Sequence, residues 1–104
     1  MYKIVYEKQA VKDIPNLKSA KLDTKAKALI ELLKNDPKSP PYEALIGNLS
    51  GLYSRRINIQ HRLVYEIIEG EINENNTKYE GIVKIIRMWT HYDKVLELAD
   101  FSHT

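Results

Sequence analysis

The sequence contains no cysteine in its 104 residues. This absence excludes disulfide bonds and metal sites built from thiolates, and it fits a protein of the reducing cytoplasm. No apolar run approaches the roughly 18 to 20 residues that cross a membrane, and the stretch Met1–Glu7 lacks the pattern of a signal peptide. We therefore expect a cytoplasmic protein without a membrane partner.

Neither sign of charge dominates the chain, whose formal net charge is only +2. The charges are nevertheless unevenly distributed: residues 1–40 carry nine lysines and five acidic residues, whereas residues 63–104 carry four basic and eight acidic residues. This asymmetry suggests one surface that meets a polyanion, with ordinary variation of surface charge as the alternative. The length and a hydrophobic content of 43% predict one folded domain over residues 1–104.

Hydrophobic periodicity predicts a strand over Tyr2–Glu7 and then two helices. The first helix begins at Lys8, and Pro15 inside it predicts a kink or a break because proline lacks the donor of a helical hydrogen bond. The second begins near Asp23 or Thr24, either of which could cap it, and it ends before Pro37. An extended linker follows.

The second half of the chain reads as β-structure. Strands Tyr53–Ile57 and His61–Ile67 form a hairpin, residues 69–80 form a long acidic loop, and Ile82–Tyr92 is a third, central strand. A short helix is expected over residues 93–99, within a C-terminal extension over residues 93–104. The predicted fold class is α+β, with two N-terminal helices on one face of a small, mainly antiparallel sheet.

The hairpin carries three arginines and a histidine within residues 55–62. Strands do not need arginine for stability, and guanidinium groups bind phosphate oxygens in pairs, so this density indicates an anionic partner. Side chains alternate along a strand, which predicts Leu63 and Tyr65 under the helices and Arg56 and Arg62 side by side on the open face. The same alternation places Arg55 on the opposite face.

The last strand adds Arg87, Trp89 and His91, which share one parity. If this parity faces away from the helices, basic side chains surround an aromatic ring and form a platform for RNA. The alternatives are structural: each arginine pairs with a nearby acid, His91 is a satisfied, partly buried histidine, Trp89 belongs to the core, and Glu43 is a surface carboxylate.

Two segments, Asn48–Tyr65 and Arg87–Tyr92, resemble the YoeB/Txe branch of the RelE-like bacterial toxins. The resemblance rests on Ser54–Ile57, on His61–Tyr65 and on the pair His91-Tyr92. It implies a RelE-like fold and an mRNA interferase that cuts mRNA in the ribosomal A site. It also implies a cognate antitoxin protein as partner, besides the ribosome and its mRNA.

The resemblance also implies roles for individual residues. Glu43 corresponds to the general base and His91 to the general acid, and Arg62, with Arg56, holds the scissile phosphate. Tyr92 matches the adjacent family tyrosine, and with Arg87, which comes from the strand alternation above, it completes the expected substrate-binding set. These groups suffice for attack by the RNA 2′-OH without a metal or other cofactor, because they can remove the proton, stabilise phosphoryl charge and protonate the leaving oxygen.

Two departures and two alternatives accompany this interpretation. The predicted loop over residues 69–80 is longer and more acidic than a tight turn. The family pattern ends at or just after the His-Tyr pair, whereas this chain continues through residue 104. The first alternative is a non-enzymatic inhibitor of DNA gyrase like the ParE toxins, which share the fold but do not need Glu43, Arg62 and His91 together. The second is a general RNA-binding module without catalytic activity.

Overall fold

The structure, a computed structural model, describes residues 1–90 in full and the backbone of His91. Within these residues, two α-helices and a five-stranded sheet confirm the α+β prediction. In chain order the elements are β1 (Lys3–Tyr6), α1 (Lys8–Ser19), α2 (Asp23–Asn35), β2 (Glu43–Ala44), the 3-10 helix η1 (Gly47–Leu49), β3 (Leu52–Arg56), β4 (His61–Glu74) and β5 (Thr77–His91).

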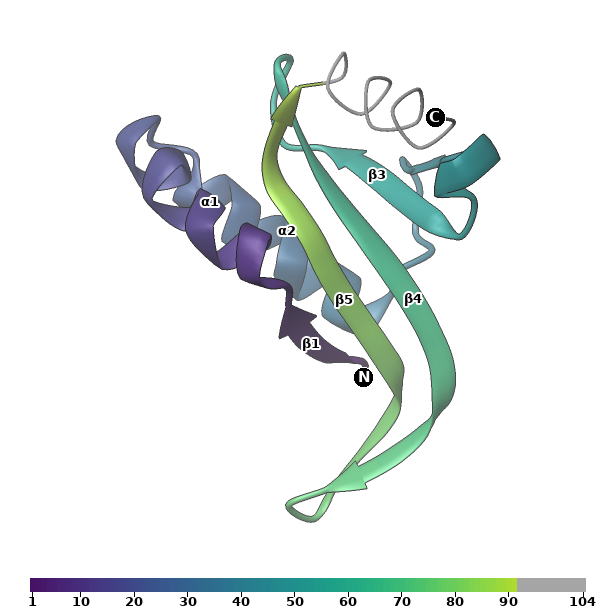
Figure 1. The fold of residues 1–104 in the computed structure, drawn as a ribbon. Helices are drawn as coiled ribbons and strands as arrows, with labels where there is room; N and C mark the ends of the chain where they lie inside the picture. The colour runs from purple at the N-terminus through teal and green to yellow at the C-terminus, as the bar shows by residue number, and fades with distance from the viewer. Residues whose placement is uncertain (92–104) are drawn as a thin grey trace.

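The five strands form one sheet in the order β1-β5-β4-β3-β2 (Figure 1). Strand β1 runs parallel to β5, and the three other pairings are antiparallel, so the sheet is mainly antiparallel as predicted. The two-residue strand β2 was not predicted from the sequence. It adds Glu43 to the edge of the sheet, where Glu43 lies opposite Ser54 of β3.

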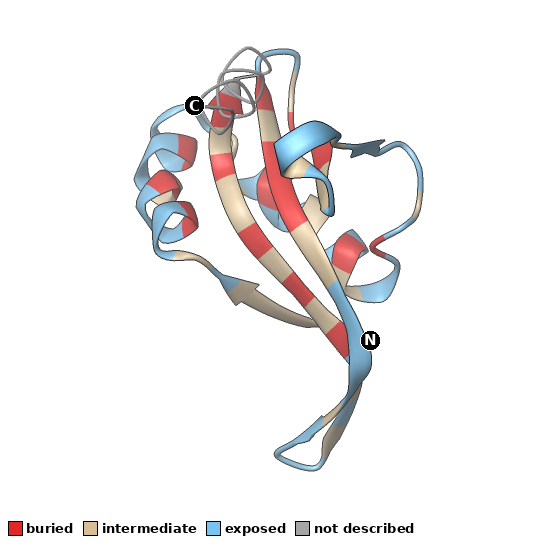
Figure 2. Cartoon of the chain, turned by 45° about the vertical axis from the view of Figure 1, so that its right-hand side comes forward, coloured by how far each residue is buried: buried red, intermediate tan, exposed pale blue. Residues whose placement is uncertain are grey.

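A single core lies between the helices and the sheet (Figure 2). Strand β4 supplies its largest fully buried side chain, Tyr65, together with the fully buried Leu63, and this confirms the predicted inward face of the hairpin. The buried residues that form this core are Ala10 and Leu17 of α1, Ala26 and Leu33 of α2, Ile57 after β3, Leu63 and Tyr65 of β4, and Val83, Ile85 and Met88 of β5.

The predicted acidic loop over residues 69–80 is wrong, because this segment continues strands β4 and β5 into a long hairpin (Figure 1). Only Asn75 and Asn76 form the turn, and both have positive φ, at 50° and 64°. Asparagine tolerates this conformation, and two such residues make the tight turn whose twist suits antiparallel strands. Charged side chains also pair across the ribbon: Lys78 lies 3.3 Å from Glu71.

Two details of the helices differ from expectation. Helix α1 continues through Pro15 without a break. Pro15 is exposed, so the Val11 carbonyl that it leaves without a helical donor lies on the solvent side of the helix. No side chain caps α2: Leu22 is the N-cap residue, and Asp23 lies in the first turn, where a negative charge favours the helix dipole.

The predicted helix over residues 93–99 and the extension over residues 93–104 lie outside the described residues. Within residues 1–91, neither helix has the length and apolar character that crossing a membrane requires.

Candidate active site

The linker between α2 and β2 delivers Glu43 to the sheet edge, and side chains of the hairpin hold this linker in place. The buried Tyr65 hydroxyl donates a hydrogen bond of 3.1 Å to the Pro37 carbonyl, and Arg55 Nη1 donates one of 2.7 Å to the Ser39 carbonyl. Burial raises the pKa of Tyr65 to about 12, so the hydroxyl stays a donor at neutral pH. These two hydrogen bonds therefore hold the linker against the β3–β4 hairpin.

An exposed ion pair between Lys38 and Glu69 also holds this linker. Lys38 Nζ lies 3.1 Å from a Glu69 carboxylate oxygen, and the Tyr2 hydroxyl donates to the other oxygen at 2.9 Å. The hydrogen bonds from Tyr2 and Lys38 lower the pKa of Glu69, and the bond to Glu69 raises the pKa of Lys38. Three contacts thus fix the chain just before Glu43.

Glu43 and Arg62 are brought together by the fold. Arg62 Nη2 lies 3.0 Å from Glu43 Oε2, and Arg62 Nε donates to the hydroxyl of Ser54. Arg56 is the register partner of Arg62 across the β3–β4 hairpin. The Arg62 side chain is only 12% exposed, whereas that of Glu43 is 46% exposed. A carboxylate open to solvent therefore lies against an arginine that is fixed in position.

These residues line a hollow of about 480 Å³ at the end of β3. Arg55 also lines it, although its side chain points to the other face, as the alternation predicts, and is nearly buried. The remaining walls come from the linker and from α2. The lining residues are Leu29, Pro41, Tyr42, Glu43, Ser54, Arg55, Arg56 and Arg62.

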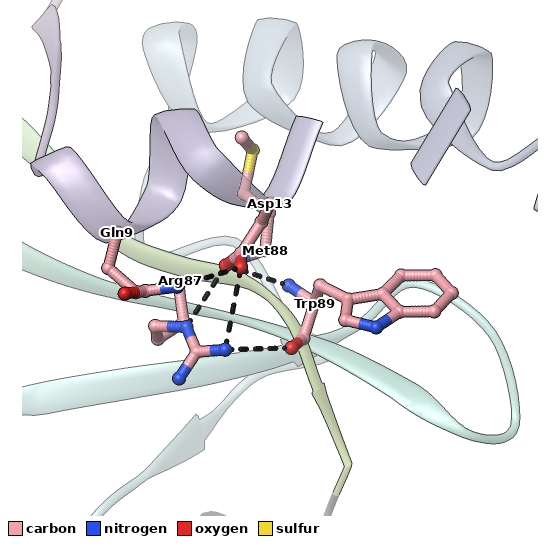
Figure 3. A network of polar contacts seen from close by, with 5 residues as sticks. All are labelled: Gln9, Asp13, Arg87, Met88 and Trp89. Carbon is pink, nitrogen blue, oxygen red and sulfur yellow. Dashed lines mark hydrogen bonds and ion pairs between the residues drawn. The ribbon is translucent and has the colours of Figure 1, made fainter. Parts of the chain in front are cut away.

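Arg87 is not among the residues that line this hollow; it belongs to a separate polar network at the edge of β5 (Figure 3). Its Nε donates to Asp13 Oδ2 at 3.0 Å, and its Nη2 donates to the Trp89 carbonyl at 3.1 Å. Asp13 also accepts the backbone N–H groups of Met88 at 2.9 Å and of Trp89 at 3.2 Å. The carboxylate of Asp13 in α1 thus accepts the backbone N–H groups of β5 that lie beyond the segment paired with β1.

Asp13 is a residue that we did not single out from the sequence. It is 2% exposed, and it shares the buried face of α1 with Ala10 and Leu17, three residues before it and four after it. A lone carboxylate inside an apolar helical stripe is the signal that was available, because a charge at such a position needs a partner.

The C-terminal end of β5 carries His91. Thr90 lies opposite Arg62, and the backbone of His91 lies opposite His61, so β5 delivers His91 next to the strand position of Arg62. The nearly buried His61 stacks on Trp89, with ring centroids 3.9 Å apart, and its Nδ1 lies 3.2 Å from the Asn58 side-chain oxygen. The side chain of His91 and all of Tyr92 lie outside the described residues.

Comparison with known proteins places this chain in a family. The sequence profile of the YoeB-like toxins of bacterial type II toxin–antitoxin systems matches residues 6–92. A search of curated proteins finds no match.

Solved structures agree with this assignment. A YoeB/ParE toxin from Agrobacterium tumefaciens is 26% identical, covers 86% of this chain and 99% of its own, and gives a TM-score of 0.71. In the YoeB–YefM complex from Staphylococcus aureus, the matching chain is 29% identical, with 88% and 99% coverage and a TM-score of 0.63. The Escherichia coli DinJ–YafQ complex, at 20% identity with 89% and 97% coverage and a TM-score of 0.68, shares the fold. The chain therefore belongs to the YoeB-like toxins of bacterial type II toxin–antitoxin systems.

Proposed function

We propose that this toxin is a ribosome-dependent endoribonuclease that cuts mRNA in the ribosomal A site and so inhibits translation. The observation that carries the proposal is the pairing of Glu43 with Arg62 in a hollow that Arg56 also lines. A solvent-open carboxylate next to two guanidinium groups is suited to accept a proton beside a bound phosphate.

Four tasks are required for cleavage of RNA by its own 2′-OH, and this chain offers a residue for each. Glu43 removes the hydroxyl proton, Arg62 and Arg56 orient the phosphate and stabilise the charge that develops on its oxygens, and His91 protonates the leaving 5′-oxygen. The products are a 2′,3′-cyclic phosphate and a 5′-hydroxyl. No step in this scheme requires a metal ion.

Before RNA binds, the two central groups hold each other. Arg62 donates to both Glu43 and Ser54, so its guanidinium is oriented before any phosphate arrives. An RNA phosphate competes with Glu43 for Arg62, and this competition leaves the carboxylate available as a base. The exchange demands a well-aligned phosphate, which is the reason we assign substrate alignment to the ribosome.

Arg87 and Tyr92 extend the binding surface in this proposal. Arg87 is 26% exposed and paired with Asp13, so it contributes positive charge near the end of β5 without leaving its partner. Tyr92 follows His91 directly and contacts the message beside the proton donor.

A cognate antitoxin is the partner that we infer in the cell. The matched structures include a YoeB–YefM complex and a DinJ–YafQ complex, both described as toxin–antitoxin assemblies. A toxin that acts on ribosomes would work in the cytoplasm, and a bound antitoxin would keep it inactive there.

Single-turnover cleavage of mRNA on programmed ribosomes tests the assignment. Glu43→Gln keeps an acceptor for Arg62 but cannot act as a base, and His91→Ala removes the acid, so each should slow cleavage by about 10²- to 10⁴-fold while ribosome binding persists. Arg62→Ala should cost on the order of 10²- to 10³-fold through lost charge stabilisation. Lys84→Ala, which removes a sheet cation paired with Glu7, serves as the matched control.

The contrary outcomes are distinct. A folded His91→Ala protein with full activity would remove the general-acid assignment. Translation arrest with intact mRNA would indicate another target, whereas growth arrest with intact mRNA and continued translation would favour the ParE-like gyrase alternative. Equal cleavage of free and ribosome-bound RNA would contradict the dependence on the ribosome.

A further inference from the structure

Strand β5 contains more residues than β4 in the stretch that leads to the proposed active site. Tyr65 lies opposite Ile85, and Arg62 lies opposite Thr90. Strand β4 therefore advances three residues between these two pairs, whereas β5 advances five, and the register shifts twice on the way. The extra residues of β5 form bulges, and bulges change the alignment of everything that follows them in a strand.

The bulges determine where His91 lies along β4. If β5 continued without extra residues past its pairing with Tyr65, His91 would lie opposite Ile59, in the loop that precedes β4. With the bulges, the backbone of His91 lies opposite His61, next to Arg62. A strand rises about 3.3 Å per residue, so two extra residues move His91 about 7 Å along β4 toward the position of Arg62.

Asp13 of α1 accepts hydrogen bonds from the bulged backbone (Figure 3). In a regular strand, consecutive N–H groups point toward opposite neighbouring strands. The N–H groups of Met88 and Trp89 instead both donate to Asp13 Oδ2, at 2.9 Å and 3.2 Å. Strand β1 pairs with β5 only as far as Ile85, so the carboxylate supplies acceptors where β1 has already ended.

The Asp13 carboxylate is itself held in place. It is 2% exposed, and Arg87 Nε donates to it at 3.0 Å. The bulged segment also places the indole of Trp89 on the buried imidazole of His61, with centroids 3.9 Å apart. His61 is the register partner of His91, so both contacts fix the stretch of β5 that delivers His91.

We propose that Asp13 is a positioning residue for RNA cleavage: it holds the bulges of β5 and thereby fixes the backbone of His91 beside Arg62. The inference rests on the proposed function, in which His91 protonates the leaving 5′-oxygen. A general acid acts only within hydrogen-bond reach of that oxygen, and a displacement of about 1 Å can cost about 10²-fold in rate. Loss of the acceptor at Asp13 should therefore slow protonation of the leaving group without weakening the binding of the message.

A pair of double variants separates positioning from charge compensation. Both contain Arg87→Met, so neither leaves a charge without its partner, and both lose the same arginine. Asp13→Asn/Arg87→Met keeps a side-chain oxygen for the two N–H groups, whereas Asp13→Leu/Arg87→Met is similar in size and has no acceptor. Asp13→Ala/Arg87→Met is a second variant without an acceptor. Circular dichroism verifies that each is folded, and Glu31→Gln, at an exposed carboxylate of α2, is the matched control.

The measurement is single-turnover cleavage on ribosomes programmed with two messages. One message has the normal 5′-oxygen at the cut, and the other has a bridging sulfur there, which leaves as a thiolate and needs no proton from an acid. On the oxygen message, Asp13→Leu/Arg87→Met should cut about 10²-fold more slowly than Asp13→Asn/Arg87→Met at the same half-saturating toxin concentration. On the sulfur message the two variants should cut at similar rates, and His91→Ala should likewise be slow only on the oxygen message.

Each contrary result has its own meaning. Equal rates of the two double variants on the oxygen message would overturn the role of Asp13 alone. An equally large loss on the sulfur message would also overturn it, because a general distortion of the site slows both messages. If Asp13→Leu/Arg87→Met does not fold, Asp13→Ala/Arg87→Met provides the same comparison. If the unmodified toxin cuts neither message on ribosomes, the proposed function fails, and the role of Asp13 fails with it.

Discussion

Replacement of Asp13 by alanine should cost this small domain a large part of its stability. The carboxylate is 2% exposed and accepts hydrogen bonds from Arg87, Met88 and Trp89. Removal of one partner from a buried ion pair typically costs about 3 to 5 kcal/mol, because the remaining charge is left without compensation. Arg87 keeps a bond to the Trp89 carbonyl and is 26% exposed, which argues for the lower part of this range.

The backbone N–H groups of Met88 and Trp89, which also lose their acceptor, keep the expected loss of stability from being smaller. Met88 is 3% exposed, so its N–H has little access to water once Asp13 is gone, and an unsatisfied buried donor costs about 1 to 3 kcal/mol. We therefore expect Asp13→Ala to lower the free energy of unfolding by about 3 to 4 kcal/mol. The total stability of such domains is about 5 to 15 kcal/mol, so the variant should be close to unfolding.

Urea unfolding followed by fluorescence and by circular dichroism would measure this loss. Trp89 is the only tryptophan in the chain, and its backbone N–H donates a hydrogen bond to Asp13. Its fluorescence therefore reports directly on the affected strand. Glu31→Ala, which removes an exposed carboxylate, should change stability by no more than about 0.5 kcal/mol. In the double variant Asp13→Ala/Arg87→Met, part of the loss should be recovered because no unpaired charge remains. A loss below about 1 kcal/mol in Asp13→Ala would refute the reasoning.

Two further predictions concern the anchors of the linker. Tyr65 ionises near pH 10 in the unfolded chain and near 12 in the folded protein, so the unfolded state loses its proton first, and about 2 to 3 kcal/mol of stability should disappear between pH 10 and 12. Urea unfolding across this pH range should show the decline in the native protein and its absence in Tyr65→Phe; parallel curves would contradict it. Arg55→Ala loses the bond to the Ser39 carbonyl and should destabilise the protein by about 1.5 to 3 kcal/mol in thermal or urea unfolding. Cleavage by the folded Arg55→Ala protein should fall less than tenfold, and a loss as large as that of Glu43→Gln would show that Arg55 acts in the chemistry.

The parts of the fold that repeat locally could be predicted from the sequence. Alternation along β4 placed Leu63 and Tyr65 in the core, and the 3.6-residue spacing located both helices. The hairpin beyond Ile68 could not be recognised in the same way, because its glutamates and asparagines resemble a loop in composition. Its strands are held by backbone pairing and by cross-strand charge pairs, and Asn75 and Asn76 supply the turn.

In the candidate site too, some residues could be predicted from the sequence and others could not. Side-chain alternation and the family resemblance together named Glu43, Arg56 and Arg62, and the fold brings these three to one hollow. Alternation along the last strand could not place Arg87, because its partner Asp13 lies 74 positions away in the chain, on the helix α1. Contacts of this kind depend on tertiary packing and leave no periodic pattern in the sequence.

The position of Glu43 illustrates why local reasoning stops short of a catalytic site. No regular element holds Glu43 beyond the two-residue strand β2, and the linker before it has no periodicity that could set its path. Besides the Lys38–Glu69 ion pair, its path is set by two backbone carbonyls, those of Pro37 and Ser39, which accept bonds from Tyr65 and Arg55. Every residue has a carbonyl, so the identity of the acceptors is invisible in the sequence even where both donors are prominent. The same two arginine-rich strands thus perform two tasks: side chains on one face hold Glu43 and the proposed phosphate site, and side chains on the other hold the segment that delivers Glu43 to it.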